Sequence, residues 1–154
     1  MSLSRTRLAP RKTRRTASGP ADADGNLFRL RRHGDPPRVL VVEDNIDARL
    51  ILEEALTSAG YAVTVAKNGI EALALLRAVP VDLMVIDLQM PELGGKPTIR
   101  AVRALGGRLA KLPIVVVSAF APPSLPGVQA VIPKPAPLDV LVERIAELLA
   151  VPPR

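Results

Sequence analysis

Residues 39–45 read VLVVEDN, and this stretch decides the fold. Val39 to Val42 form a continuous apolar run rich in β-branched side chains, which is typical of a strand buried on both faces of a parallel sheet. The acidic pair Glu43 and Asp44 follows the run directly. We therefore expect a buried strand that ends in carboxylates at the edge where open α/β sheets bind ligands.

Strand and helix patterns alternate along the rest of the chain. The last segment shows the helical pattern, with Leu138, Leu141 and Ile145 on one apolar stripe. Further strands are predicted over residues 61–65, 81–86, 112–117 and 128–132, and helices over 47–59, 69–79, 97–105 and 138–149. Such alternation predicts an α/β fold with helices on both faces of a parallel sheet. Five strands in roughly 115 residues predict the flavodoxin-like, doubly wound order 2-1-3-4-5.

Charge divides the chain into two parts. Residues 1–38 hold ten Lys and Arg against three Asp, a net charge of +7, whereas residues 39–154 hold eleven against twelve acids, a net charge of −1. We predict a disordered basic leader or linker over residues 1–37, one domain over 38–150 and a short tail over 151–154. The leader could contact nucleic acid weakly through phosphates, but a linker or solubilising tail is the favoured interpretation.

Composition narrows the possible chemistry. The chain has no cysteine, which excludes disulfides, thiolate zinc sites and cysteine nucleophiles. This composition suits a cytoplasmic protein. Because the chain has neither a membrane-length apolar run nor an apolar secretory segment near its start, we expect no membrane partner.

Polar residues follow the predicted strands at the edge where ligands bind. Glu43 and Asp44 follow the first strand, Asp87 the third, Ser118 the fourth and Lys134 the fifth. The first and third strands are neighbours in the predicted order, so three carboxylates should converge and repel unless a cation neutralises them. Oxygen ligands favour a hard ion such as Mg²⁺. A carboxylate nucleophile, a metal, a lysine and a hydroxyl together suit phosphoryl transfer.

Four motifs in order, VLVVEDN, VIDLQMP, VVVSA and PKP, resemble those of response regulator receiver domains such as the chemotaxis response regulator. The resemblance covers about residues 38–150. It implies a two-component signalling module, not an enzyme, that accepts a phosphoryl group on Asp87 from a histidine kinase or a histidine phosphotransfer protein. It implies Mg²⁺ as cofactor and a downstream protein that the sequence does not identify.

The resemblance also implies individual roles. Asp44 corresponds to the direct metal ligand and Glu43 to a ligand that commonly acts through water. Asp87, the phosphoacceptor, also belongs to the metal site, and Gln89 corresponds to a residue that offers its backbone carbonyl to the metal.

Two further residues correspond to the part of the site that contacts the phosphoryl group, and a third, Pro135, follows the second of them. Ser118 corresponds to the hydroxyl residue that moves toward this group, and Lys134 to the lysine that contacts it. The peptide bond before Pro135 is expected to be cis.

Two positions depart from the family pattern. Val131 stands three residues before the lysine, where an aromatic switch residue is usual. Residues 119–127 read AFAPPSLPG, which is too short and too rich in proline for a normal crossover helix. We therefore expect the fourth helix to be missing or reduced to a turn, and the usual output surface to be rebuilt.

Other interpretations fit parts of the pattern. Acidic residues before a helix often serve only as caps, and Asp47 is the expected cap of the first helix. A haloacid-dehalogenase-like phosphatase also uses an aspartate nucleophile and Mg²⁺, but that family has Asp-x-Asp where Asp87 is followed by Leu88 and Gln89. The chain could also be the receiver piece of a hybrid kinase with a basic nucleic-acid-binding arm.

Overall fold

A parallel sheet of five strands forms the centre of residues 34–150, the part of the chain that the computed structural model describes. The strand order β2-β1-β3-β4-β5 confirms the predicted flavodoxin-like topology. The strands are β1 (Arg38–Val42), β2 (Ala62–Ala66), β3 (Leu83–Ile86), β4 (Ile114–Ser118) and β5 (Ala130–Pro133). The helices are α1 (Ile46–Ser58), α2 (Gly69–Ala78), α3 (Gly95–Ala104) and α4 (Leu138–Ala150), with a short 3₁₀ helix η1 (Gly107–Lys111).

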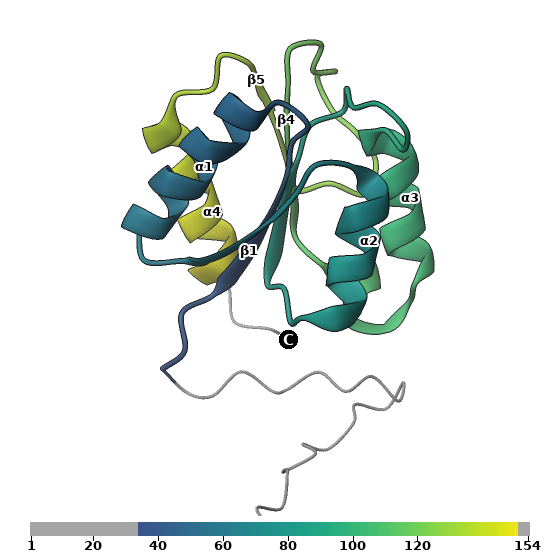
Figure 1. The fold of residues 1–154 in the computed structure, drawn as a ribbon, viewed down its shortest axis with the longest axis horizontal. Helices are drawn as coiled ribbons and strands as arrows, with labels where there is room; N and C mark the ends of the chain where they lie inside the picture. Colours follow the sequence, from purple (N-terminus) through teal and green to yellow (C-terminus); the bar gives the residue numbers. More distant parts are fainter. Residues whose placement is uncertain (1–33, 151–154) are drawn as a thin grey trace, which may run out of the picture.

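Helices cover both faces of the sheet, with α1 and α4 on one face and α2 and α3 on the other (Figure 1). Successive side chains of a strand point to opposite faces, so each buried strand contributes to two cores. In β1, Leu40 and Val42 pack toward α2 and α3, whereas Val39 and Val41 pack toward α1 and α4. This double burial explains why the central strands β1, β3 and β4 contain continuous apolar runs instead of alternating apolar and polar residues.

The cap of α1 differs from the prediction. Asn45, and not Asp47, is the N-cap, because its side-chain oxygen accepts a hydrogen bond from the Ala48 N–H at 2.9 Å. The helix begins at Ile46, so Asp47 lies in its first turn, where a carboxylate still complements the helix dipole. The expectation for Asp47 as the cap was therefore wrong by two positions.

Prolines and turns shift several other boundaries. Pro113 has no N–H to donate, and β4 begins at Ile114, two residues after the predicted start at Leu112. Val128 donates its N–H to Leu125 in a turn, and β5 begins at Ala130. Pro97 lies in the first turn of α3, where its missing N–H costs little, so that helix begins earlier than predicted.

The segment between β4 and β5 contains turns and bends but no helix, which confirms the reduced fourth helix. Leu125 and Val128 from this segment pack on the core of the α2 and α3 face. Arg103 of α3 holds the segment through hydrogen bonds to the Gly127 carbonyl oxygen, one of them from Nε at 3.1 Å. Its Nη1 donates to the Leu109 carbonyl oxygen, also at 3.1 Å.

The predicted leader and tail lie almost wholly outside the described residues, which exclude 1–33 and 151–154. Their predicted disorder and the proposed weak contact with nucleic acid remain expectations. Among residues 34–150, no helix combines the length and the apolar character needed to cross a membrane.

Candidate functional site

Strand register brings three carboxylates together at one edge of the sheet. Val42 of β1 pairs with Ile86 of β3, so the next residues, Glu43 and Asp87, leave the sheet at the same level. Asp44 follows Glu43, and one carboxylate oxygen from each of these three acids lies within 4.8 Å of the others. The parallel sheet thus places residues more than forty positions apart in one cluster, as the strand-end pattern predicted.

Glu43 is the most enclosed member of the cluster, with only 2% of its surface exposed. Its carboxylate accepts hydrogen bonds from the Asn45 N–H at 3.1 Å and from Lys134 Nζ at 2.8 Å. Burial raises the pKa of Glu43, and the hydrogen bonds from Lys134 and Asn45 offset this effect only in part. The charged form of Glu43 therefore depends on nearby cations.

Asp87 is 7% exposed and is held from two sides. Its Oδ1 accepts the N–H of Gln89 at 3.0 Å, and its Oδ2 accepts from Lys134 Nζ at 2.8 Å. The Gln89 N–H thus points back to the carboxylate, while the direction of the Gln89 carbonyl stays a prediction.

Lys134 joins the ends of three strands. It follows β5 directly, and its ammonium contacts the carboxylates that follow β1 and β3. Burial lowers the pKa of the Lys134 ammonium, but the hydrogen bonds that it donates to Asp87 and Glu43 outweigh burial and raise that pKa overall. The Lys134–Pro135 peptide bond is cis.

Ser118 ends β4 as a fully buried residue. Its Oγ has no hydrogen-bond partner among the described residues. Most buried hydroxyls in proteins are hydrogen-bonded, so an orphaned hydroxyl at a ligand-binding edge needs a specific explanation. A bound oxyanion is one group that could accept its hydrogen bond.

Sequence reasoning missed two residues that support the cluster. Asn45 both caps α1 and presents its backbone N–H to Glu43. Arg49 of α1 donates from Nη1 to the Glu43 carbonyl oxygen at 3.0 Å. An Asn after an acidic pair is a recognisable helix cap, so the role of Asn45 could have been predicted. The hydrogen bond of Arg49 depends on how α1 packs beside the end of β1, which no local sequence pattern reveals.

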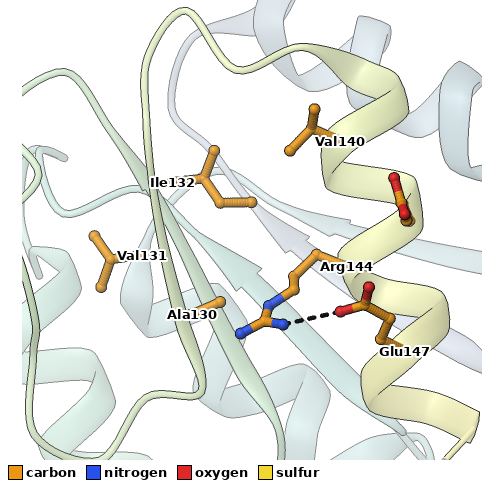
Figure 2. A pocket seen from close by; sticks show the side chains of 7 residues that line it. Ala130, Val131, Ile132, Val140, Arg144 and Glu147 are labelled. Atoms are coloured by element: carbon orange, nitrogen blue, oxygen red, sulfur yellow. Dashed lines mark hydrogen bonds and ion pairs between the residues drawn. The ribbon is translucent and has the colours of Figure 1, made fainter.

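A separate cavity of about 410 Å³ lies between β5 and α4, and none of its lining residues belongs to the acidic cluster (Figure 2). Arg144 and Glu147 of α4 form an ion pair at its wall at 2.8 Å. Val131 lies on the opposite side of β5 from Ile132 and packs on the core of the α2 and α3 face. Val131 therefore occupies the usual aromatic switch position as a partly buried aliphatic residue.

Comparison with known proteins identifies the family. A family profile described as the response regulator receiver domain matches residues 39–146. The chain belongs to the response regulator receiver domain family. Receiver domains are signalling domains of two-component systems that interact with histidine kinases or phosphotransfer proteins, and they bind Mg²⁺ at an acidic pocket. This membership sets aside the phosphatase alternative.

Several relatives of this receiver domain illustrate the similarity. The sensor histidine kinase TmoS of Ectopseudomonas mendocina is 44% identical over 85 residues, which are 55% of this chain and 8% of TmoS. The response regulator MprA of Mycobacterium sp. (strain KMS) is 37% identical over 120 residues, 74% of this chain and 51% of MprA. The receiver domain thus spans about half the length of MprA and a small fraction of TmoS.

A solved structure shares the fold of the receiver domain. The response regulator TrrA of Thermotoga maritima, in complex with Mg²⁺ and BeF, superposes with a TM-score of 0.67 at 28% identity. The match covers 73% of this chain and 99% of TrrA.

Proposed function

We propose that Asp87 accepts a phosphoryl group from a histidine kinase or a histidine phosphotransfer protein, and that this modification signals through a conformational change. The observation that carries the proposal is the juxtaposition of Asp87 with Glu43, Asp44 and Lys134 at the end of the sheet. We also propose that residues 38–150 form the receiver domain and that the exchange takes place in the cytoplasm, where ATP-dependent kinases supply phosphoryl groups.

The proposed reaction is a displacement at phosphorus. A carboxylate oxygen of Asp87 attacks the phosphorus of a phosphohistidine, the P–N bond breaks, and the electron pair of that bond stays on the imidazole nitrogen, which is protonated. The product on this chain is an acyl phosphate. Positioning and charge neutralisation dominate such transfers. The Lys134 ammonium, 2.8 Å from Asp87 Oδ2, is placed to hold an oxygen of the transferred group, and the Ser118 hydroxyl can donate to another.

The residues present fit Mg²⁺. The cluster offers only oxygen donors, the preference of a hard divalent ion. Glu43, Asp44 and Asp87 would hold the ion with their carboxylates, and Gln89 with its backbone carbonyl. When bound, Mg²⁺ supplies positive charge that offsets repulsion among the carboxylates and the phosphoryl oxygens. Burial raises the pKa of Glu43, and a bound cation would oppose this effect because it stabilises the charged carboxylate.

The full chain should be incubated with acetyl phosphate and Mg²⁺, and phosphorylation followed by intact mass and by hydroxylamine sensitivity. We expect one acyl phosphate that Asp87→Asn abolishes and that omission of divalent cation prevents. Asp44→Ala should suppress labelling by weakening Mg²⁺ binding. Asp47→Asn is the matched control, because Asp47 is an exposed carboxylate only three positions from Asp44 and should label like the unmodified chain. Labelling that survives Asp87→Asn, or that needs no divalent cation, contradicts the proposal.

A further inference from the structure

The loop that follows the proposed phosphoacceptor is tied to the start of α2. This loop comprises residues 88–94, between Asp87 and the start of α3. Asn68, the residue before α2, donates from its side-chain Nδ2 to Glu92 Oε2 at 3.0 Å. The Gly69 N–H donates to the Leu93 carbonyl oxygen at 3.3 Å. The N-cap and the first residue of α2 therefore hold two adjacent residues of the loop, Glu92 and Leu93.

Both polar atoms of the Asn68 side-chain amide form hydrogen bonds. Its Oδ1 caps α2 by accepting the Glu71 N–H at 2.8 Å, while its Nδ2 holds Glu92. Only 8% of Asn68 is exposed. An aspartate at this position could cap the helix equally well, but it could not donate to Glu92. Capping alone does not require an amide at position 68. The hydrogen bond to Glu92 gives a reason for one, because an amide can both accept from Glu71 and donate to Glu92.

Glu92 has an unusual backbone. Its φ of 65° makes it the one residue other than glycine with a positive φ among residues 34–150. Long side chains rarely adopt this left-handed region, and such a conformation persists where the surroundings determine it. The hydrogen bond from Asn68 is one such determinant.

Close packing also fixes the base of the loop, where Leu88 and Gly95 meet. The Gly95 N–H donates to the Leu88 carbonyl oxygen at 3.1 Å, which closes the loop on itself. A Cβ on Gly95 would collide with the Asp87 carbonyl oxygen, so the start of α3 can approach the backbone of Asp87 this closely only with glycine at position 95. Gln89, whose carbonyl is the proposed metal contact, lies between this base and the point held by Asn68.

We propose that Asn68 and Glu92 are positioning residues for this loop: their hydrogen bond holds the backbone around Gln89 in the conformation that binds Mg²⁺. The inference rests on the proposed function and assigns to it two residues that lie outside the acidic cluster. Partners that orient metal ligands without touching the metal commonly change metal affinity by about tenfold or more when they are replaced.

Reversing the hydrogen bond tests the inference. Asn68→Asp keeps a helix cap but sets a carboxylate against Glu92. Glu92→Gln keeps an acceptor for Asn68. In the double variant Asn68→Asp with Glu92→Gln, the new amide can donate to the new carboxylate, and the net charge equals that of the unmodified chain. The double variant is therefore a matched control for both charge and capping.

Two readouts are needed, and both use the full chain. Titration calorimetry measures Mg²⁺ affinity, and amide hydrogen exchange without divalent cation reports on the Gln89 and Gly95 N–H groups. We expect Asn68→Asp to weaken Mg²⁺ binding by about tenfold and to accelerate exchange at both amides. Glu92→Gln should stay close to the unmodified chain, and the double variant should recover most of the lost affinity and protection.

The outcomes separate this inference from the proposed function. Unchanged Mg²⁺ affinity and exchange in Asn68→Asp overturn the inference, as does a double variant as impaired as the single one. A chain that binds Mg²⁺ but is never labelled on Asp87 contradicts the proposed function, while the affinities still decide the role of Asn68 and Glu92. A chain that binds no Mg²⁺ overturns both.

Discussion

The Lys134 ammonium lies 2.8 Å from Asp87 Oδ2 and 2.8 Å from Glu43 Oε2, so one cation joins the carboxylates that follow β3 and β1. Both acids are buried, whereas the Lys134 side chain is 29% exposed. Without a metal, this lysine is the cation that compensates the two enclosed charges. In the function proposed above, the same ammonium would also bind an oxygen of the phosphoryl group on Asp87.

Lys134→Ala is expected to destabilise the metal-free domain by about 2 kcal/mol, because it leaves two buried carboxylates without their shared partner. Mg²⁺ should restore part of this loss, so the variant should gain more stability from Mg²⁺ than the unmodified chain does. Urea denaturation with and without Mg²⁺ measures both quantities. Lys111→Ala, at an exposed lysine, is the control. If Mg²⁺ raises the free energy of unfolding equally in the variant and the unmodified chain, Lys134 and Mg²⁺ do not compensate the same carboxylates.

Ser118→Ala is expected to leave the free energy of unfolding within about 1 kcal/mol, because the buried Oγ gives up no hydrogen bond to the described residues. The response to phosphorylation should instead be lost. Amide exchange of the segment 119–129 with and without beryllofluoride and Mg²⁺ measures that response. A strongly destabilised variant would show that Ser118 has a structural role. If beryllofluoride and Mg²⁺ change amide exchange in the variant as they do in the unmodified chain, Ser118 takes no part in the response.

Arg103→Ala is expected to destabilise the domain by about 2 kcal/mol and to accelerate amide exchange in the segment 119–129. The guanidinium donates to the Gly127 and Leu109 carbonyl oxygens at once, so it ties the segment between β4 and β5 to α3 and η1. Arg103→Lys should restore little, because an ammonium lacks the fork that reaches both oxygens.

Arg100→Ala is the control for this effect, since Arg100 is exposed on the same helix. If both alanine variants behave alike in urea denaturation and in exchange, the hydrogen bonds of Arg103 do not hold the segment.

Phe120→Ala is expected to shorten the lifetime of the phosphorylated state severalfold without changing stability. Phe120 lies two residues after Ser118 and is 77% exposed, so it is free to cover the site when Ser118 moves and to restrict attacking water. The decay of the acyl phosphate after removal of the phosphodonor measures the lifetime. An unchanged decay would show that Phe120 takes no part.

The fold and the residues of the candidate cluster could be predicted because both depend on local pattern. The neighbouring strands β1 and β3 carry apolar residues toward both faces, and each is followed directly by an acidic residue, so the strand order alone brings Glu43, Asp44 and Asp87 to one edge. The reduced fourth helix was equally readable, since the prolines of residues 119–127 exclude a regular helix whatever surrounds them. The roles of these residues and of Gln89 remain predictions that the proposed variants test.

Not every difference between prediction and structure has the same origin. The N-cap of α1 is a local feature, because Asn45 and Asp47 are both good capping residues and the structure uses Asn45. Other features depend on contacts between residues far apart in the chain. The hydrogen bonds of Arg49, Arg103 and Asn68 instead depend on where helices pack relative to strand ends and loops, and side chains that look solvated in the sequence prove to hold backbone carbonyls or loop carboxylates.

By itself, the sequence determined the layers, the strand order and the edge at which chemistry is possible, because burial and strand periodicity act over a few neighbouring residues. Only the tertiary structure decided that Lys134 bridges Glu43 and Asp87, that Ser118 is buried with an unpaired hydroxyl, and that Asn68 holds the loop after Asp87. These relationships depend on distances of a few ångströms between residues far apart in the chain. Such distances arise only when the whole sheet and its helices are packed together.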